Sequence, residues 1–302
     1  MAASGLPQTT PSMKPLLTLA FLTATLAAYA QPGSEVWLLS INDDYGTFTL
    51  SDPKNISQNP GYDNQPSFLP DGSGLLYTSQ QASGQTDIIR YELATGQKTQ
   101  LTATAVGSEY SPTPMPDGKH FSTIRLDTNG LQLLYRYPLT PGGEPEVIIP
   151  EAVIGYHTWV NDTLLMAFVL GDPVTLQRCV TSTGQCTVAD ESIGRSLHVV
   201  PLNGAVSYVS KADTANWTMA LINPLEGEGR PLNLPMDGTE DTAWRGNGSL
   251  FRTGGHLLYR WRPGADESWQ VVADLTKLGI TGTLTRLAFH PDGTHLALVA
   301  SE

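Results

Sequence analysis

The sequence contains few basic residues and few charges of any kind. Lys and Arg together number 17 against 29 Asp and Glu, which gives a formal net charge of −12, and charged residues make up only 15% of the 302 residues. No segment gathers its basic residues into a stripe. Because nucleic-acid binding depends on Lys and Arg that neutralise backbone phosphates, this composition argues against a nucleic acid as the partner.

The motifs of the common catalytic and nucleotide-binding folds are missing. There is no G-x-S-x-G nucleophile elbow, no H-E-x-x-H zinc site, no G-x-x-x-x-G-K-[ST] phosphate loop and no G-x-G-x-x-G dinucleotide motif. Residues 42–46 (NDDYG) faintly resemble a calcium loop, but they lack the EF-hand spacing and the closing Glu, so a hairpin turn is the better interpretation. The motifs therefore assign no catalytic residue, no cofactor and no metal ligand.

Long hydrophobic runs are absent after the N-terminal region. Residues 16–26 (LLTLAFLTATL) follow Met13-Lys14 and precede an A-x-A pattern at residues 28–30, which is typical of a cleaved signal peptide. The run is shorter than the ~20 residues that a membrane-spanning helix needs. We therefore expect residues 1–30 to be an N-terminal extension and signal peptide, and a periplasmic or secreted mature chain to begin near Gln31 without a membrane span. An uncleaved N-terminal anchor is the alternative, and either Met1 or Met13 can be the true start.

Glycine and proline are frequent, and they mark a repeat. Pro-Asp-Gly occurs at residues 70–72, 116–118 and 291–293, each time before a β-rich run, and three decayed copies fill the gap between the second and the third. The aligned Asp and Asn residues are Asp71, Asp117, Asp162, Asn203, Asn247 and Asp292. Steps of 41 to 46 residues between these positions, with short strands in each repeat, are typical of a β-propeller.

Each complete repeat has room for four strands, and both ends of the chain carry half a repeat. Residues 35–51 read as strand, turn and strand, whereas the last repeat stops after two strands. We therefore predict an all-β fold, a six-bladed β-propeller over residues 31–302, with the last blade closed by N-terminal strands that pair with C-terminal strands. Such closure removes exposed sheet edges. An open solenoid or a two-sheet sandwich would leave the two half-repeats unexplained.

The two cysteines, Cys179 and Cys186, occupy the two sides of a turn. The segment RCVTSTGQCT aligns with RYELATGQKT of an earlier repeat, where the central residues form a hairpin. Two cysteines across a hairpin of an exported protein favour a disulfide. Two reduced thiols, or a zinc site with further ligands, are the alternatives, although the C-x6-C spacing does not favour zinc.

The segment YDNQPSFLPDGSGLLYTSQQASGQTDIIRYELATGQKTQLT resembles the TolB-like propeller repeats of bacterial periplasmic proteins. The resemblance covers residues 35–302 and is strongest in the first, second and last repeats. It implies an exported six-bladed propeller. TolB itself carries an α/β domain before its propeller, and we expect this chain to lack it, since the first strand follows closely after Gln31. Similar repeats also occur in propellers attached to serine peptidases and in sugar-degrading lyases.

Residues just before or at the start of each inner strand should surround one mouth of the channel. Loop residues near the axis are a common binding surface of propellers, although loops are polar by default. His157 and His198 align on the innermost strand, where they could serve as bases or ligands, but packing or hydrogen bonding is the simpler interpretation. The predicted binding residues are Tyr62, Asp63, Glu109, Tyr110, Tyr156, His157, Arg195, His198, Glu240, Asp241 and Arg286.

These features favour a non-enzymatic propeller that presents a loop face to an envelope or extracellular protein. The alternative is a saccharide-binding protein or a polysaccharide lyase-like enzyme that acts at the channel mouth. Such an enzyme would need a base such as His157 or His198 and a cation such as Arg195 or Arg286. The absence of a known motif is weak evidence against activity, because propeller enzymes assemble their sites from scattered loop residues.

Overall fold

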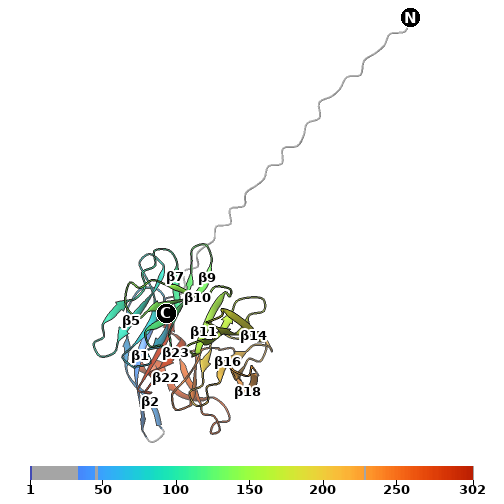
Figure 1. The fold of residues 1–302 in the computed structure, drawn as a ribbon. Coiled ribbons are helices and arrows are strands. Elements are labelled where there is room, and N and C mark those ends of the chain that lie inside the picture. The colour runs from blue at the N-terminus through green and yellow to red at the C-terminus, as the bar shows by residue number, and fades with distance from the viewer. Residues whose placement is uncertain (2–32, 45–46, 228, 302) are drawn as a thin grey trace. The chain divides into compact units, whose positions relative to one another are not determined.

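The computed structural model describes residue 1 and residues 33–44, 47–227 and 229–301, and its strands form six four-stranded antiparallel sheets (Figure 1). The predicted signal peptide and the predicted mature start at Gln31 lie outside the described residues. Within the described ranges, no helix is both long enough and apolar enough to cross a membrane. The prediction of an all-β, six-bladed propeller is confirmed.

Each blade is one sheet, and in blades 1 to 5 its four strands follow one another along the chain. The first three blades are blade 1 (β3 Asp63–Phe68, β4 Gly74–Gln80, β5 Thr86–Glu92, β6 Lys98–Gln100), blade 2 (β7 Ser108–Pro114, β8 His120–Leu126, β9 Gln132–Pro138, β10 Glu146–Ile149) and blade 3 (β11 Ile154–Asn161, β12 Leu164–Val169, β13 Thr175–Val180, β14 Gln185–Glu191). Blade 4 contains β15 His198–Val199, β16 Val206–Ser210, β17 Thr218–Ile222 and β18 Gly229–Pro235. Blade 5 contains β19 Thr242–Trp244, β20 Leu250–Gly254, β21 Leu257–Trp261 and β22 Gln270–Asp274, and a short 3-10 helix, Leu275–Leu278, follows it.

Blade 6 joins the two ends of the chain, as the half-repeats predict. It consists of β23 Thr283–Phe289, β24 His295–Ser301, β1 Ser34–Asp44 and β2 Thr47–Asn55, in the sheet order β2-β1-β24-β23. β1 pairs with β24 in an unbroken antiparallel register from Ser34↔Ser301 to Ser40↔His295. Inner strands of neighbouring blades contact each other from β11 through β15, β19, β23 and β3 to β7, and β11 contacts β8 and β9 of blade 2, so the ring is closed.

The turn between the first two strands of each blade explains the repeat. The Asp71 side chain accepts hydrogen bonds from the Ser73 backbone N–H at 2.9 Å and the Ser73 hydroxyl at 2.8 Å, and Gly72 has a φ of +72° that favours glycine. In blade 3 the residue that makes this bond is Asn161, which accepts from the Thr163 N–H at 3.0 Å. The alignment that chose Asp162 is therefore off by one residue, because only the side chain two positions before the donor can close this turn.

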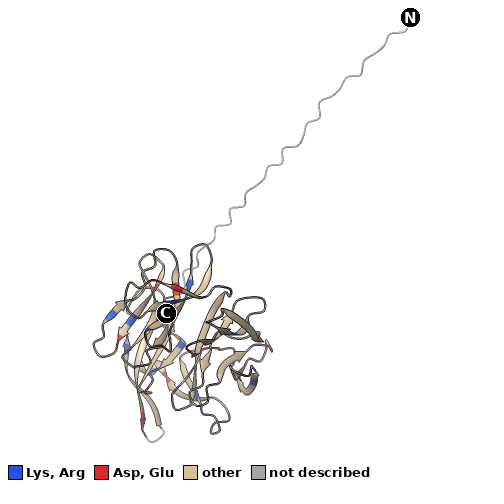
Figure 2. Ribbon diagram, viewed as in Figure 1, with Lys and Arg blue, Asp and Glu red and all other residues tan. Residues whose placement is uncertain are grey.

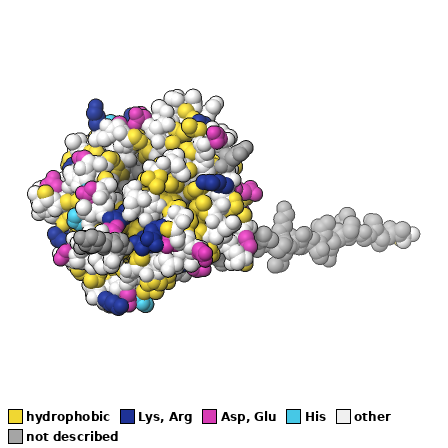
Figure 3. Space-filling model, turned by 90° about the horizontal axis from the view of Figure 1, so that it is seen from below, with side chains coloured by type: hydrophobic (Ala, Val, Ile, Leu, Met, Phe, Trp, Pro, Cys, Tyr) yellow, Lys and Arg dark blue, Asp and Glu magenta, His cyan; other side chains and the backbone are white. Residues whose placement is uncertain are grey.

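The core lies between adjacent sheets, which hold the inner strands in place. Between blades 6 and 1, for example, Val36 and Val299 pack with Leu75 and Tyr77, all nearly inaccessible to solvent. The blade faces are apolar because each sheet is covered on both sides by its neighbours. Charged residues are spread thinly over the ribbon (Figure 2), and the face seen in Figure 3 mixes acidic, basic and apolar side chains.

Candidate functional site

The inner strands enclose a cavity of about 260 Å³. The loops at the end of the propeller where the inner strands begin form what we call the loop face. Every blade contributes to the lining: Gln65, Ser111, Tyr156, His198, Asp241 and Arg286 come from blades 1 to 6 in that order. Of the predicted binding residues, the structure brings six together in this lining: Tyr156, His157, Arg195, His198, Asp241 and Arg286.

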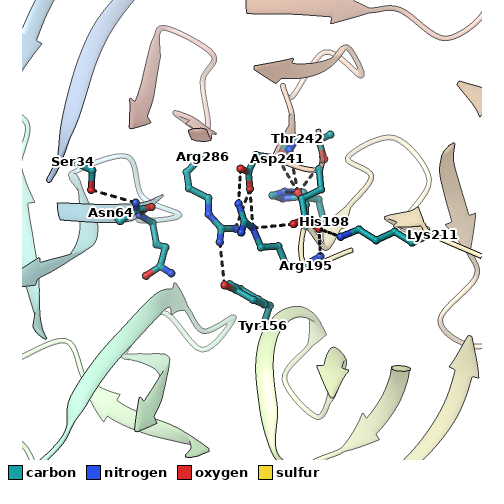
Figure 4. A network of polar contacts seen from close by, with 12 residues as sticks. Ser34, Asn64, Tyr156, Arg195, His198, Lys211, Asp241, Thr242 and Arg286 are labelled. Carbon is teal, nitrogen blue, oxygen red and sulfur yellow. Dashed lines mark hydrogen bonds and ion pairs between the residues drawn. The ribbon is translucent and has the colours of Figure 1, made fainter. Parts of the chain in front are cut away.

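Arg195 and Arg286 converge on one buried carboxylate (Figure 4). Asp241 accepts a hydrogen bond from Arg195 Nη2 at 2.9 Å, and its other oxygen lies 3.2 Å from Arg286 Nη1. Burial tends to raise the pKa of Asp241, but the charges of Arg286 and Arg195 outweigh burial and hold this pKa below its usual value. Asp241 is therefore ionised at neutral pH and compensates one of the two guanidinium charges.

A second carboxylate fixes Arg195 from the other side. Glu240 Oε2 accepts from the Arg195 backbone N–H at 2.9 Å and from Lys211 Nζ at 2.9 Å. The cluster of Arg195, Lys211, Glu240, Asp241 and Arg286 thus carries three positive and two negative charges. An excess positive charge at the axis contrasts with the net charge of −12 of the whole chain.

Three tyrosines stand beside this charged cluster. Arg286 Nη2 donates to the Tyr156 hydroxyl at 3.2 Å, and its guanidinium carbon lies 4.9 Å from the centre of the Tyr156 ring. The rings of Tyr62 and Tyr110 meet edge to face with 6.3 Å between centroids. Burial raises the pKa of Tyr62, and the nearby positive charge of Arg286 opposes that rise. Tyr62 and Tyr110 therefore belong to the surroundings of Arg286, although they do not line the cavity itself.

His157 and His198 are neutral polar groups in the wall. Burial lowers the pKa of His157 to about 3 and that of His198 to about 4. Ser122 Oγ lies 2.6 Å from His157 Nε2, accepts the Trp159 indole N–H at 2.9 Å and lies 3.2 Å from the Thr113 carbonyl, which can accept its proton. The other ring nitrogen, Nδ1, is buried without a partner among the described residues.

Asp63 and Glu109, which the alignment assigns to the channel mouth, do not line the cavity. Both are fully buried near the boundaries between blades. Glu109 accepts from the Tyr137 hydroxyl at 3.0 Å and from the Thr104 hydroxyl, while Asp63 Oδ2 accepts from Asn59 at 3.2 Å. Successive side chains of a strand point to opposite sides. The neighbours of residues that face the cavity therefore point into the space between adjacent sheets. Burial raises the pKa of both carboxyls, to about 6 for Asp63.

Sequence reasoning missed Gln65, Ser111 and Lys211. Gln65, Ser111 and Arg286 have positive φ values of 58°, 54° and 33°, and each lies at a bulge in its inner strand. Residues in this strained region often belong to functional sites. Each of the three residues lies six positions before the Asp of a Pro-Asp-Gly turn, so the sequence shows that they are equivalent. Their residue types differ, however, and none of them indicates a bulge.

The cysteines lie away from the cavity, on the outer strands of blade 3. Cys179 in β13 and Cys186 in β14 pair directly across the ladder and are joined by a disulfide, with 4.1 Å between their Cα atoms. In the part of the chain that the structure describes, no three His, Cys, Asp or Glu side chains are arranged to hold a metal ion.

Comparison with known proteins finds similar structures but little similar sequence. No protein-family model matches the chain. A dipeptidyl-peptidase 5 from Porphyromonas endodontalis is 33% identical over 70 residues, which make up 21% of this chain and 10% of the peptidase. The match thus spans about a tenth of the length of that relative.

Among solved structures, one assigned to TolB from Agrobacterium tumefaciens has a TM-score of 0.67 at 13% identity and covers 89% of this chain and 99% of its own. The propeller is TolB-like in its fold. TolB from Acinetobacter baumannii matches with a TM-score of 0.56 at 14% identity, over 89% of this chain and 64% of its own. An oligogalacturonate lyase from Vibrio parahaemolyticus matches with a TM-score of 0.52 at 14% identity, over 90% of this chain and 98% of its own. At these identities the likeness concerns the fold alone, which the TolB structures share with an oligogalacturonate lyase.

Proposed function

We propose that the chain is an exported, non-enzymatic propeller that binds an envelope or extracellular protein through its loop face. The observation that carries this proposal is a row of exposed aliphatic side chains on that face. Five residues of blades 2 and 3 are between 38% and 54% exposed, and we call them the apolar ridge: Val106, Leu126, Leu131, Val153 and Leu170.

Hydrogen bonds join the segments that carry four of the five residues: Leu126, Leu131, Val153 and Leu170. The Asp127 N–H bonds the Leu131 carbonyl, the Gln132 side chain reaches across the blade boundary to the Ile154 carbonyl at 2.9 Å, and the Leu170 N–H bonds the Val153 carbonyl. All five residues lie in or beside the loops that lead into the inner and third strands. Clustered exposed aliphatic groups are characteristic of protein interaction sites, whereas isolated ones are common on any surface.

The apolar ridge also adjoins the channel. Phe168, two residues before Leu170, packs edge to face on Tyr156 with 5.7 Å between ring centroids, and Tyr156 contacts Arg286. A protein partner could therefore cover the apolar ridge and reach the charged cluster in one interface. Such a combination of apolar centre, aromatic residues and Arg is typical of energetically important interface positions.

The test is capture of partners from an envelope extract by the tagged mature chain. We compare the native protein with the double variant Leu131→Ser/Val153→Ser and with the matched control Leu202→Ser/Leu225→Ser, which alters aliphatic residues of 72% and 71% exposure in turns at the opposite end. We expect one protein to be retained by the native chain and the control and lost from the ridge variant. Equal retention by all three would refute the loop face as the binding surface.

A second candidate, a saccharide-binding or lyase-like activity, is favoured by one observation. His157 Nδ1 and Ser111 Oγ are buried without partners among the described residues, and both residues line the cavity. Hydroxyl groups of a sugar would satisfy them, and the lyase from Vibrio parahaemolyticus shares the fold. Oligosaccharides that raise the melting temperature would support this candidate. Turnover that disappears in His157→Ala or His198→Ala with the fold retained would establish an enzyme, whereas no stabilisation and no turnover would eliminate the candidate.

A further inference from the structure

We propose that the charged cluster at the axis is a carboxylate-binding subsite, in which an acidic side chain of the bound protein lies between Arg195 and Arg286. This inference rests on the proposed function and names the chemistry that the partner must bring to the loop face. The remainder of the interface would be formed by the apolar ridge.

The first argument is charge. The cluster of three cations and two carboxylates retains one positive charge. Arg195 and Arg286 are 34% and 16% exposed in their side chains, so this charge is only partly screened by water. Elsewhere the chain carries an excess of acidic residues, which disfavours an acidic ligand. An anion is therefore attracted to the axis rather than to the surface as a whole.

The second argument is the number of donors. Each guanidinium has five N–H groups. Arg195 uses Nε and Nη2 toward Asp241, and its Nε also lies 3.5 Å from Glu240 Oε1. Arg286 uses Nη1 toward Asp241 and Nη2 toward Tyr156. Donors of both residues remain for a further acceptor, and both residues line the cavity. A carboxylate can accept several such charge-assisted bonds at once.

The third argument is preorganisation. Asp241 holds both guanidinium groups, Glu240 holds the backbone and side chain of Arg195, and Tyr156 holds Arg286 from the opposite side. Figure 4 shows the two guanidinium groups side by side at the centre of the ring. Little side-chain entropy is lost when an acceptor arrives at groups that are already fixed. If the two arginines served only as partners of Asp241, the additional contacts with Glu240 and Tyr156 would not be needed.

The experiment compares two probes that differ only in charge, the peptides Ac-Leu-Glu-Leu-NH2 and Ac-Leu-Gln-Leu-NH2. Binding to the mature chain is followed by NMR through the Nε–H signals of the arginine side chains. We expect the Glu peptide to shift the signals of Arg195 and Arg286 and to bind at least tenfold more tightly than the Gln peptide. In Arg286→Gln and in Arg195→Gln the preference should fall below threefold, whereas the matched control Arg262→Gln, whose guanidinium pairs with Asp266 on the outside of blade 5, should keep it.

Melting temperatures of both cluster variants identify any loss of fold, and each variant leaves Asp241 one arginine partner. Equal affinity for the two peptides, no shift with either, or a preference that persists in both cluster variants would overturn the subsite. Tighter binding of galacturonate than of the Glu peptide would show that the subsite prefers the carboxylate of a sugar acid to that of a protein side chain. Partner capture that depends on the apolar ridge without any Glu preference would remove the subsite and leave the proposed function standing.

Discussion

The side chain of Arg286 crosses the channel to Tyr156. Arg286 lies in β23 of blade 6 and Tyr156 in β11 of blade 3, which are opposite blades of a six-membered ring, and Nη2 donates to the phenol oxygen at 3.2 Å. The two residues are 130 positions apart in the sequence. This bond spans the channel from the guanidinium that, together with Arg195, contacts Asp241.

Replacing Tyr156 by Phe should release Arg286 with a small effect on stability. A single partly buried hydrogen bond to a charged donor contributes about 1–2 kcal/mol, and the aromatic ring that packs against Phe168 is retained. We expect the free energy of unfolding in urea to decrease by about 1 kcal/mol. The Nε–H signal of Arg286 should exchange faster with solvent. An unchanged exchange rate would mean that the bond across the channel does not restrain Arg286.

Replacing Asp241 by Asn should be far more damaging. The change removes the carboxylate that compensates two guanidinium groups, and leaving buried cations without their partner costs about 3 kcal/mol or more. As a control, Glu146→Gln interrupts the ion pair with Arg136, in which Glu146 is 66% exposed, and should change the free energy of unfolding by less than about 0.5 kcal/mol. Similar effects of the two substitutions in chemical denaturation would contradict the importance given to Asp241.

The two channel histidines should make the protein less stable in mild acid. Their folded pKa values, about 3 for His157 and about 4 for His198, lie below the unfolded value near 6.5, so the unfolded chain takes up protons that the folded chain refuses. Stability is therefore full above pH 6.5 and falls as the pH decreases toward 4, by about 1.4 kcal/mol per pH unit for each histidine. His157→Gln or His198→Gln should reduce this slope, while His256→Gln, at a side chain 52% exposed, should leave it unchanged. The slope is obtained from unfolding curves between pH 4 and 7.

Reduction of the disulfide should loosen one hairpin and leave the channel intact. The bond joins two cysteines that are only 7 positions apart. In the chain-entropy model, a loop of this size restricts the unfolded chain enough to stabilise the fold by about 2 kcal/mol. We expect Cys179→Ala/Cys186→Ala to lower the melting temperature and to speed amide hydrogen exchange in β14, an outer strand. Exchange in β11 and β15 should not change, and faster exchange there would show that blade 3 unfolds as a whole.

The sequence allowed prediction of the architecture because the feature that repeats is a local one. The side chain of Asp71 closes its turn through an atom two residues away, so the spacing of such turns can be read without knowing the fold. The half-repeats at the two ends were recognised from the same local spacing of turns, and they predicted the pairing of β1 with β24. In blade 3 the rule failed by one residue, because Asn161 and Asp162 are adjacent and both can form such a turn.

The site was harder to predict because it depends on the side of the inner strand to which each side chain points. Six of the eleven predicted residues line the cavity, but the bulges at Gln65 and Ser111 change which neighbour faces the channel. The sequence does not show such a bulge, and Asp63 and Glu109 were therefore assigned to the channel mouth. Nor does it show that Lys211 reaches Glu240, since that contact joins the second strand of blade 4 to the start of blade 5.

The position of Asp63 leads to a prediction whose sign is opposite to that of the histidines. Asp63 is fully buried, its Oδ1 has no partner among the described residues, and burial raises its pKa to about 6. Because the folded pKa lies above the unfolded value near 4, the carboxyl stabilises the fold when protonated, and this contribution is lost as the pH rises from 4 through 6.

Asp63→Asn should therefore increase the free energy of unfolding at pH 7 by about 3 kcal/mol relative to its effect at pH 4. Glu109 occupies the equivalent position of the next blade, with Oε2 likewise unpartnered within the described ranges. The structural equivalence extends to the donors, since the Ser34 hydroxyl bonds the Asp63 carbonyl and the Thr86 hydroxyl bonds the Glu109 carbonyl. Glu109→Gln should consequently show the same sign, whereas Asp213→Asn, on an exposed loop, should show little pH dependence between pH 5 and 7. Urea unfolding at a series of pH values measures all three. A gain at pH 4 as large as that at pH 7 would mean that improved packing, rather than removal of a buried charge, stabilises the variants.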